Sequence, residues 1–226
     1  MILTRRTLLT LTTCAAALAA TGAATSLWAE TSAPAATTDA ATPAAAAPVI
    51  TDFTLGDPNA KVKIVEYLSF TCPHCERFHA EVFPKLKAEY IDKGLVNITY
   101  HEVYFDQYGL FGAMVARCGG EMRYFGITDM LYDKQRDWAA AEDITGVVDA
   151  LKKIARTAGM DDATVDACLH DQPMAEALVA HYQSNIATDY PNDSFAGTPS
   201  FLINGAKYAN MSFEDLKVIL DAEIAK

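Results

Sequence analysis

The chain has few basic residues for its length. Its 226 residues include 18 Lys and Arg against 29 Asp and Glu, which gives a formal net charge of −11. Binding to nucleic acid requires a concentrated basic surface. The sequence also has no long run of like charges and no Gly-rich loop of the kind that cradles phosphate. We therefore expect no nucleic-acid partner.

Acidic residues are missing from the first 29 positions. Arg5 and Arg6 precede a mildly apolar stretch at 8–20, and small residues follow as far as Ala29. This pattern is typical of an export signal and predicts a signal peptide at 1–29, hence a periplasmic location. The arginine pair fits either a general secretory signal or a twin-arginine signal. Anchoring by an uncleaved signal is a third alternative, which the weak hydrophobicity of the Ala- and Thr-rich stretch disfavours.

Large apolar side chains are rare in the segment that follows. Residues 30–48 consist mainly of Ala, Thr, Pro and Ser without periodicity. Such a composition predicts a flexible linker. We expect one folded domain at 49–226.

Cysteine is scarce, with five in the chain. Cys14 lies in the predicted signal, which leaves Cys72, Cys75, Cys118 and Cys168. An even number in an exported chain favours two disulfides. A bridge between Cys118 and Cys168 would close a loop of about 50 residues and stabilise the domain, and two buried free thiols are the alternative.

Hydrophobic periodicity in the folded part predicts an α/β protein. The apolar run Val62–Phe70 predicts a buried strand, a helix kinked at Pro84 follows it, and Val96–Phe105 predicts a second strand. Amphipathic segments over about 107–187 predict a helical insertion. Residues 200–209, with Asn-Gly at their centre, predict a hairpin that leads into a last helix. The predicted order is βαβ, helical insertion, ββα.

Cys72-Pro73-His74-Cys75 lies where the first strand meets the first helix. A thiolate at Cys72 would face the positive end of the helix dipole and free backbone N–H groups. Pro73 in the first turn costs no hydrogen bond. His74 adds a donor, and a positive charge when it is protonated. These features predict a redox pair in which Cys72 is the exchanging sulfur and Cys75 lies behind it.

Two further residues near this pair leave alternatives open. Glu66 is the charged residue within the apolar core of the first strand, where it either faces an edge or is buried with a raised pKa and relays protons near the cysteines. Cys72, Cys75 and His79 could begin a zinc site, but no second pair with ligand spacing follows. We therefore expect no metal and place His79 on the helix surface.

Two motifs carry a family resemblance. They are Val65-Glu-Tyr-Leu-Ser-Phe-Thr-Cys-Pro-His-Cys75 and Gly197-Thr-Pro-Ser-Phe-Leu-Ile-Asn-Gly205. In this order they resemble the DsbA family of periplasmic thiol:disulfide oxidases, which have a thioredoxin fold with a helical insertion, in the subgroup near the BdbD-type oxidases. The resemblance spans about residues 50–226. That a stabilised thiolate makes such a disulfide oxidising is established for DsbA itself.

The resemblance implies an enzyme whose reactive group is its own disulfide, with no bound cofactor. It implies that the Cys72–Cys75 disulfide passes through a mixed disulfide to reduced, unfolded exported polypeptides. It also implies that a DsbB-like membrane quinone reductase reoxidises the pair. Thr198 and Pro199 would form the cis-proline loop that pairs with substrate. Thr198 stands where some family members have Val, and its hydroxyl changes the surroundings of the thiolate.

Two other functions fit the same residues. A reductase or isomerase could use this fold, although an isomerase usually needs two facing sites on a dimer and the sequence has no visible dimerisation domain. A peptide-binding, chaperone-like module would instead use aromatic residues of the insertion as its surface, although core packing is their more common role. These aromatic residues are Tyr124, Phe125, Tyr132 and Trp138.

Overall fold

The structure, a computed structural model, describes residues 47–192 and 194–226. The predicted signal peptide at 1–29 and residues 30–46 of the predicted linker lie outside the described residues. Within the described ranges, no helix is long and apolar enough to cross a membrane.

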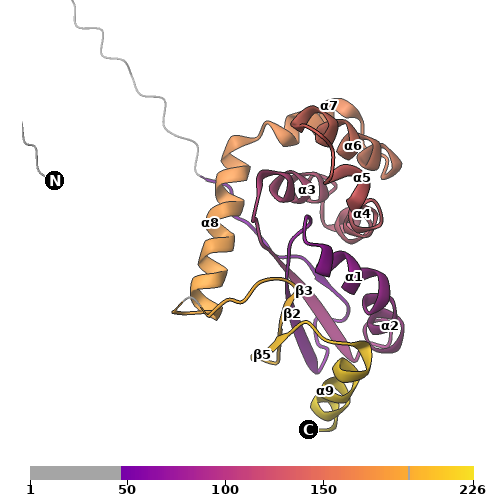
Figure 1. Cartoon of the computed structure of the whole chain (residues 1–226). Coiled ribbons are helices and arrows are strands. Elements are labelled where there is room, and N and C mark those ends of the chain that lie inside the picture. Colours follow the sequence, from indigo (N-terminus) through magenta and orange to yellow (C-terminus); the bar gives the residue numbers. More distant parts are fainter. Residues whose placement is uncertain (1–46, 193) are drawn as a thin grey trace, which may run out of the picture. The chain divides into compact units, whose positions relative to one another are not determined.

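A five-stranded sheet in the order β1-β3-β2-β4-β5 forms the centre of the domain (Figure 1). The strands are β1 (Thr54–Leu55), β2 (Val62–Leu68), β3 (Val96–Glu102), β4 (Ser200–Ile203) and β5 (Ala206–Ala209). β2 and β3 are parallel, and the other neighbours are antiparallel. The predicted order of elements is confirmed. The sequence did not indicate β1, because two residues are too few to show an alternating pattern.

The described residues also form nine α-helices and one π-helical turn. They are α1 (Pro73–Glu81), α2 (Phe83–Leu86), the π-helical turn η1 (Lys87–Ile91), α3 (Gln107–Cys118), α4 (Glu121–Asp133), α5 (Gln135–Trp138), α6 (Ile144–Thr157), α7 (Asp162–Leu169), α8 (Gln172–Asp189) and α9 (Phe213–Ala225). The predicted kink at Pro84 is a break between α1 and α2. Proline has no N–H to donate, and its ring displaces the carbonyl four residues earlier.

Both predicted strands before the insertion end earlier than expected. β2 ends at Leu68 because the chain turns there, and the Cys72 N–H donates to the Ser69 carbonyl at 3.1 Å. β3 ends at Glu102, and Phe105 beyond it is 56% exposed. The sequence predicted longer strands because the loop residues that follow each strand are also hydrophobic.

Helices cover both faces of the sheet. Apolar residues of α1 and α9 share one core with the β2 residues Ile64 and Leu68. A smaller cluster on the other face holds Tyr67, whose hydroxyl donates to Asp189 Oδ2 of α8 at 2.5 Å. Figure 1 shows α8 running along the sheet on the side away from α1. Alternate residues of β2 therefore serve two cores, as a central strand requires.

The C-terminal hairpin and helix form as predicted. Asn204 and Gly205 both have positive φ, 46° and 85°, which is the backbone of a type I′ turn. Ser212 caps α9, because its hydroxyl accepts from the Asp215 N–H at 3.1 Å. This hairpin places β4 beside β2, directly after the predicted cis-proline loop.

Asp52 joins two histidines for which the sequence indicated no partner. Its carboxylate lies 3.2 Å from Nε2 of His101 in β3 and 2.8 Å from Nε2 of His181 in α8. Burial alone would raise the pKa of Asp52, but hydrogen bonds and charge from the two histidines lower it overall. The segment before β1 is thereby fixed to both the sheet and α8.

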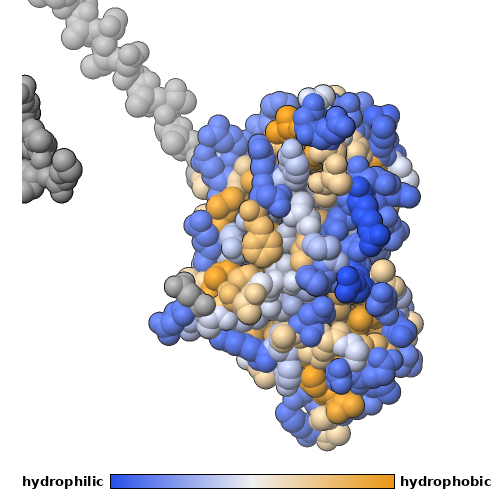
Figure 2. Space-filling model, viewed as in Figure 1, coloured by the Kyte–Doolittle hydropathy of each residue, from blue (hydrophilic) through white to orange (hydrophobic). Residues whose placement is uncertain are grey.

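The helices α3 to α8 form the insertion between β3 and β4. A disulfide joins Cys118, the last residue of α3, to Cys168 in α7. On the face drawn in Figure 2, hydrophobic residues lie in separate patches among hydrophilic ones.

Candidate redox site

Cys72 and Cys75 lie at the N-terminus of α1, directly after β2. Cys72 is the N-cap residue with an extended backbone, and Pro73 occupies the first turn. Cys72 is 9% exposed and Cys75 fully buried, and both are free thiols. The arrangement leaves one sulfur open to exchange and encloses the other.

The two sulfurs differ sharply in acidity. The pKa of Cys72 is lowered to about 5, chiefly by a hydrogen bond from Cys75. The Thr198 side chain and the N–H groups of Cys75 and His74 lower it further, and burial partly opposes them. The pKa of Cys75 is raised, chiefly by burial and then by its hydrogen bond and charge interaction with Cys72. At neutral pH the reduced pair therefore carries a single negative charge, on the more exposed sulfur.

The Thr198–Pro199 loop faces the exchanging sulfur. Its peptide bond is cis, and Gly197 before it has a φ of 125°. The Cys72 thiol donates to the Thr198 carbonyl at 3.3 Å. The Thr198 hydroxyl is buried and has no partner among the described residues while Cys72 is protonated. A Cys72 thiolate supplies an acceptor, which is why this hydroxyl lowers the pKa.

His74 contributes through its backbone. Its side chain is exposed. The part of His74 that lowers the pKa of Cys72 is the N–H at the start of α1. This contribution follows from the free N–H groups of a helix N-terminus and would exist with most residues at this position. A tuning role for the imidazole itself stays a prediction.

Glu66 lies beneath the cysteines on the central strand β2, where it pairs with Tyr100 of β3 and Phe201 of β4. It is fully buried, and neither carboxylate oxygen has a hydrogen-bond partner within the described structure. Burial, with a smaller effect of the Cys72 charge, raises the pKa of Glu66 well above its ordinary value. The alternative that Glu66 faces an edge of the sheet is wrong.

The expectation that His79 lies on the helix surface is also wrong. His79 is 7% exposed, and its ring stacks on Tyr132 of α4 with centroids 4.2 Å apart. Burial lowers its pKa to about 3, so the imidazole is neutral at physiological pH. His79 follows Cys75 by four residues and therefore shares its inward face of α1. That spacing was the signal that could have predicted its burial.

The insertion holds the loop before Cys72, which sequence reasoning missed. Gln135 of α5 donates from Nε2 to the Phe70 carbonyl at 2.9 Å and to the Cys72 carbonyl at 3.0 Å. The Tyr132 hydroxyl donates to the Ser69 carbonyl at 3.2 Å. The Phe70 carbonyl has no other donor among the described residues, whereas the Ser69 and Cys72 carbonyls also accept from the N–H groups of Cys72 and Glu76.

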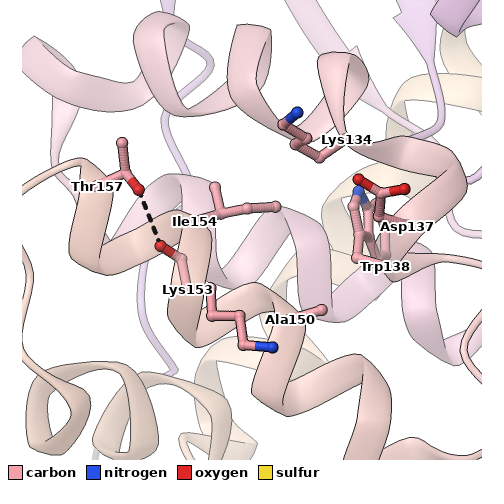
Figure 3. Close-up of a pocket in the computed structure, with 7 residues that line it drawn as sticks. All are labelled: Lys134, Asp137, Trp138, Ala150, Lys153, Ile154 and Thr157. Carbon is pink, nitrogen blue, oxygen red and sulfur yellow. Dashed lines mark hydrogen bonds between the residues drawn. The ribbon is translucent and has the colours of Figure 1, made fainter.

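A cavity of about 370 Å³ lies elsewhere in the insertion, between α5 and α6. Figure 3 shows Ile154 at its middle and the ammonium groups of Lys134 and Lys153 on opposite sides. Its lining includes neither cysteine nor any residue of the cis-proline loop. In the described part of the chain, no group of three or more His, Cys, Asp or Glu residues is placed to hold a metal ion.

Together these features define a class. A dithiol at a helix N-terminus, opposite a cis-proline loop on this sheet, is the arrangement of thioredoxin-fold redox proteins. The chain matches the family model described as Thioredoxin over residues 49–222. The chain belongs to the DsbA family of thioredoxin-like disulfide oxidoreductases. The predicted fold class and family are thereby confirmed.

The relatives share this family. The chain is 32% identical over 174 residues to the "Putative protein-disulfide oxidoreductase" of Rickettsia bellii, covering 76% of this chain and 64% of that protein. It is 31% identical over 190 residues to the "Probable disulfide bond formation protein D" of Bacillus anthracis, covering 78% and 80%. The crystal structure of Wolbachia pipientis alpha-DsbA1 aligns with a TM-score of 0.69 at 25% identity, covering 79% of this chain and 93% of that one. The chain thus spans less than two thirds of the length of the Rickettsia bellii relative.

Proposed function

We propose that this protein is a periplasmic thiol:disulfide oxidase that transfers the Cys72–Cys75 disulfide to reduced exported polypeptides. The observation that carries the proposal is the pKa of about 5 at Cys72 beside a buried Cys75 of raised pKa. Thiolate stabilisation exists only in the reduced form, at about 1.4 kcal/mol for each pKa unit. It therefore favours the dithiol over the disulfide, and the disulfide becomes an oxidant.

The reaction follows from the two acidities. A substrate thiolate attacks Cys72 Sγ, a mixed disulfide forms, and Cys75 leaves and takes up a proton. A second substrate thiolate then attacks the substrate sulfur of the mixed disulfide and releases Cys72 as a thiolate, which its low pKa makes a good leaving group. The substrate loses two electrons and gains a disulfide, and the enzyme pair is reduced. A DsbB-like membrane quinone reductase would accept those electrons and restore the disulfide.

Glu66 would supply the proton that Cys75 takes up. Its raised pKa keeps the carboxyl protonated when the reaction begins. Its charge, once the proton has left, contributes to the raised pKa of Cys75, so the titrations of the two groups are coupled. The Thr198–Pro199 loop would align an extended substrate segment beside Cys72.

The redox equilibrium of the pair against glutathione buffers tests the proposal, with oxidised and reduced forms counted by alkylation and mass spectrometry. We expect a potential more oxidising than about −200 mV, whereas a value near the roughly −270 mV of thioredoxin would indicate a reductase. The oxidised protein should also form disulfides in reduced, unfolded ribonuclease. Cys72→Ser and Cys75→Ser should each abolish this transfer, because neither variant can hold the Cys72–Cys75 disulfide that the substrate thiolate attacks.

The double variant Cys118→Ala with Cys168→Ala is the matched control, because it removes the other two cysteines of the described residues and leaves the redox pair. It should still oxidise ribonuclease. If Cys72→Ser protects unfolded polypeptides from aggregation as well as the native protein does, and the native protein oxidises none of them, the chaperone-like alternative holds instead.

A further inference from the structure

A small polar cavity lies between α1 and α4, on the far side of His79 from the sheet. Its volume is about 150 Å³, and its lining is formed by Glu76, His79 and Ala80 of α1 and by Asp129, Tyr132 and Asp133 of α4. Such a space is large enough for water, which needs at least about 10–15 Å³ and two or more polar partners.

Buried polar atoms without partners lead from this cavity toward Glu66. His79 Nδ1 faces the cavity side, 3.8 Å from Asp129 Oδ1, and His79 Nε2 lies 4.0 Å from Glu66 Oε1. Neither His79 Nδ1 nor either Glu66 oxygen has a hydrogen-bond partner among the described residues. Buried groups of this kind are usually satisfied by water or serve a chemical role. Both gaps are about 1 Å longer than a hydrogen bond, a difference that a small movement of the side chains would close.

The outer end of this series reaches solvent. The Asp129 side chain is 55% exposed, whereas the side chains of His79 and Glu66 are 3% and 0% exposed. Burial, with the charge of Asp133, raises the pKa of Asp129 to about 6, and Lys87 opposes that rise. A carboxyl group that titrates near neutral pH is suited to exchange protons with solvent.

Four titratable groups face His79 from the elements packed against it. They are Glu66 of β2, Tyr100 of β3, and Asp129 and Tyr132 of α4. None of them is a fixed positive charge, and the imidazole itself is neutral. A neutral imidazole accepts a proton at one nitrogen and donates from the other, so it can pass a proton without holding a net charge.

We propose that His79 and Asp129 form the outer part of a proton path that joins solvent in the α1–α4 cavity to Glu66, and through Glu66 to Cys75. The path rests on the proposed use of Cys72 and Cys75 as the exchanging pair. When the disulfide opens, Cys75 takes a proton from Glu66, and the Glu66 carboxylate recovers one from solvent through His79 and Asp129. When the disulfide forms again, the proton from Cys75 leaves by the same route. His79 and Asp129 act through Glu66 and do not touch the reacting sulfurs.

Asp129→Asn tests the path, because it keeps the shape of a largely exposed side chain and removes its ability to exchange protons. The readout is the rate at which excess dithiothreitol reduces the Cys72–Cys75 disulfide, measured by rapid mixing, acid quench and alkylation. We expect a rate about tenfold lower, below the 10²–10⁴-fold typical of a direct general acid, because water still offers a slower route. Formate, a small proton carrier, should restore the rate as its concentration rises.

The pH profile gives a second readout. After correction for the thiolate fraction of dithiothreitol, the native rate should be higher below an inflection near pH 6, where Asp129 is protonated. Asp129→Asn should lose that inflection. His79→Gln should slow the reaction to a similar degree, and the double variant should be no slower than either single one, because both block one route.

Asp133→Asn is the matched control, since Asp133 lines the same cavity one turn further along α4. It should keep the native rate at pH 5 and keep an inflection, moved somewhat below pH 6 because the charge of Asp133 helps to raise the pKa of Asp129. The proposal is overturned if Asp129→Asn matches the native protein from pH 5 to 8, if Asp133→Asn loses as much rate, or if formate rescues nothing. If His79→Gln fails to fold, Asp129→Asn still decides. Dithiothreitol reduces the native disulfide whether or not the protein oxidises polypeptides. Failure of the proton path would therefore appear in the rate of reduction by dithiothreitol, and failure of the oxidase proposal in the ribonuclease assay.

Discussion

The Thr198 carbonyl oxygen lies 3.3 Å from Cys72 Sγ, across the gap between the cis-proline loop and the start of α1. The hydroxyl of the same threonine is buried without a partner in the described structure. The backbone of this residue thus accepts from the thiol, and its side chain lowers the pKa of Cys72. Thr198, which stands where some family members have Val, therefore stabilises the Cys72 thiolate in this protein.

Thr198→Val should raise the pKa of Cys72 from its value of about 5. A hydrogen bond to a charged group is worth about 1.5–3 kcal/mol, which corresponds to a rise of about one to two pH units. The pair should also become less oxidising, since its thiolate loses stabilisation. Ultraviolet absorbance of the thiolate during a pH titration measures the change.

Thr71→Val is the control for this substitution. The Thr71 hydroxyl donates to Asp106 Oδ2 at 2.7 Å and is not among the groups that lower the pKa of Cys72. It should leave the thiolate titration unchanged. An unchanged pKa in Thr198→Val would contradict the assigned role of the hydroxyl.

Glu66→Gln should stabilise the reduced protein at high pH. The folded-state pKa of Glu66 is raised above its unfolded value, so the unfolded chain releases this proton first as pH rises above about 4.5. Stability therefore falls with rising pH until the folded carboxyl also ionises. Gln cannot ionise, so the variant should exceed the native protein by on the order of 1–3 kcal/mol at pH 8 and by little at pH 4.

Guanidinium unfolding of the reduced proteins at both pH values measures this difference. Glu102→Gln provides the contrast, because Glu102 is paired with Arg117 at 2.7 Å and accepts from Tyr124 at 2.5 Å. Removing one partner of a buried ion pair should lower stability at pH 8. Equal effects of Glu66→Gln at pH 4 and pH 8 would show that its carboxyl is not held protonated by the fold.

The features that the sequence predicted well depend on neighbours in the chain. Strand alternation, the start of α1 after Cys72 and the Asn204-Gly205 turn are all set within a few residues. The position of Cys72 opposite Thr198 came from the family resemblance, because no local pattern joins residues so far apart. The early ends of β2 and β3 were missed, since exposed Phe105 and loop residue Phe70 look like strand residues.

Asp129 and Gln135 were missed for a different reason. Their contacts with α1 and with the loop before it exist only because α4 and α5 pack there. Gln135 and the carbonyls of Phe70 and Cys72 that it binds are more than sixty residues apart in sequence. Hydrophobic periodicity does not indicate a contact between residues so far apart, and a polar residue in an amphipathic helix is expected to face solvent.

Gln135→Ala should lower the free energy of unfolding by about 1–3 kcal/mol, because two buried carbonyls lose a donor. It should also slow reduction by dithiothreitol, since the loop that holds Cys72 would be less well fixed. Gln135→Glu should be worse than Gln135→Ala at pH 7, as a carboxylate would face the same carbonyls. Chemical unfolding and the rapid-mixing assay measure the two effects.

Gln172→Ala is the matched control for Gln135. Its side chain is exposed and, among the described residues, bonds only Glu176 at 2.7 Å. We expect a change within about 0.5 kcal/mol. If Gln135→Ala is as mild as this control, the insertion does not hold the loop through Gln135.

The Cys118–Cys168 disulfide closes a loop of 50 residues that contains α4, α5 and α6. The chain-entropy model assigns such a closure about 4 kcal/mol of stability, mainly by restricting the unfolded chain. Replacing both cysteines with Ala should therefore lower the unfolding free energy by up to that amount, as measured in guanidinium. The same loop carries Asp129, Tyr132 and Gln135, but their packing on α1 persists in the folded state, so the rate of reduction by dithiothreitol should stay within about twofold of native. A large loss of rate with little loss of stability would instead mean that the bridge acts on the folded state, by fixing α4 and α5 against the redox site.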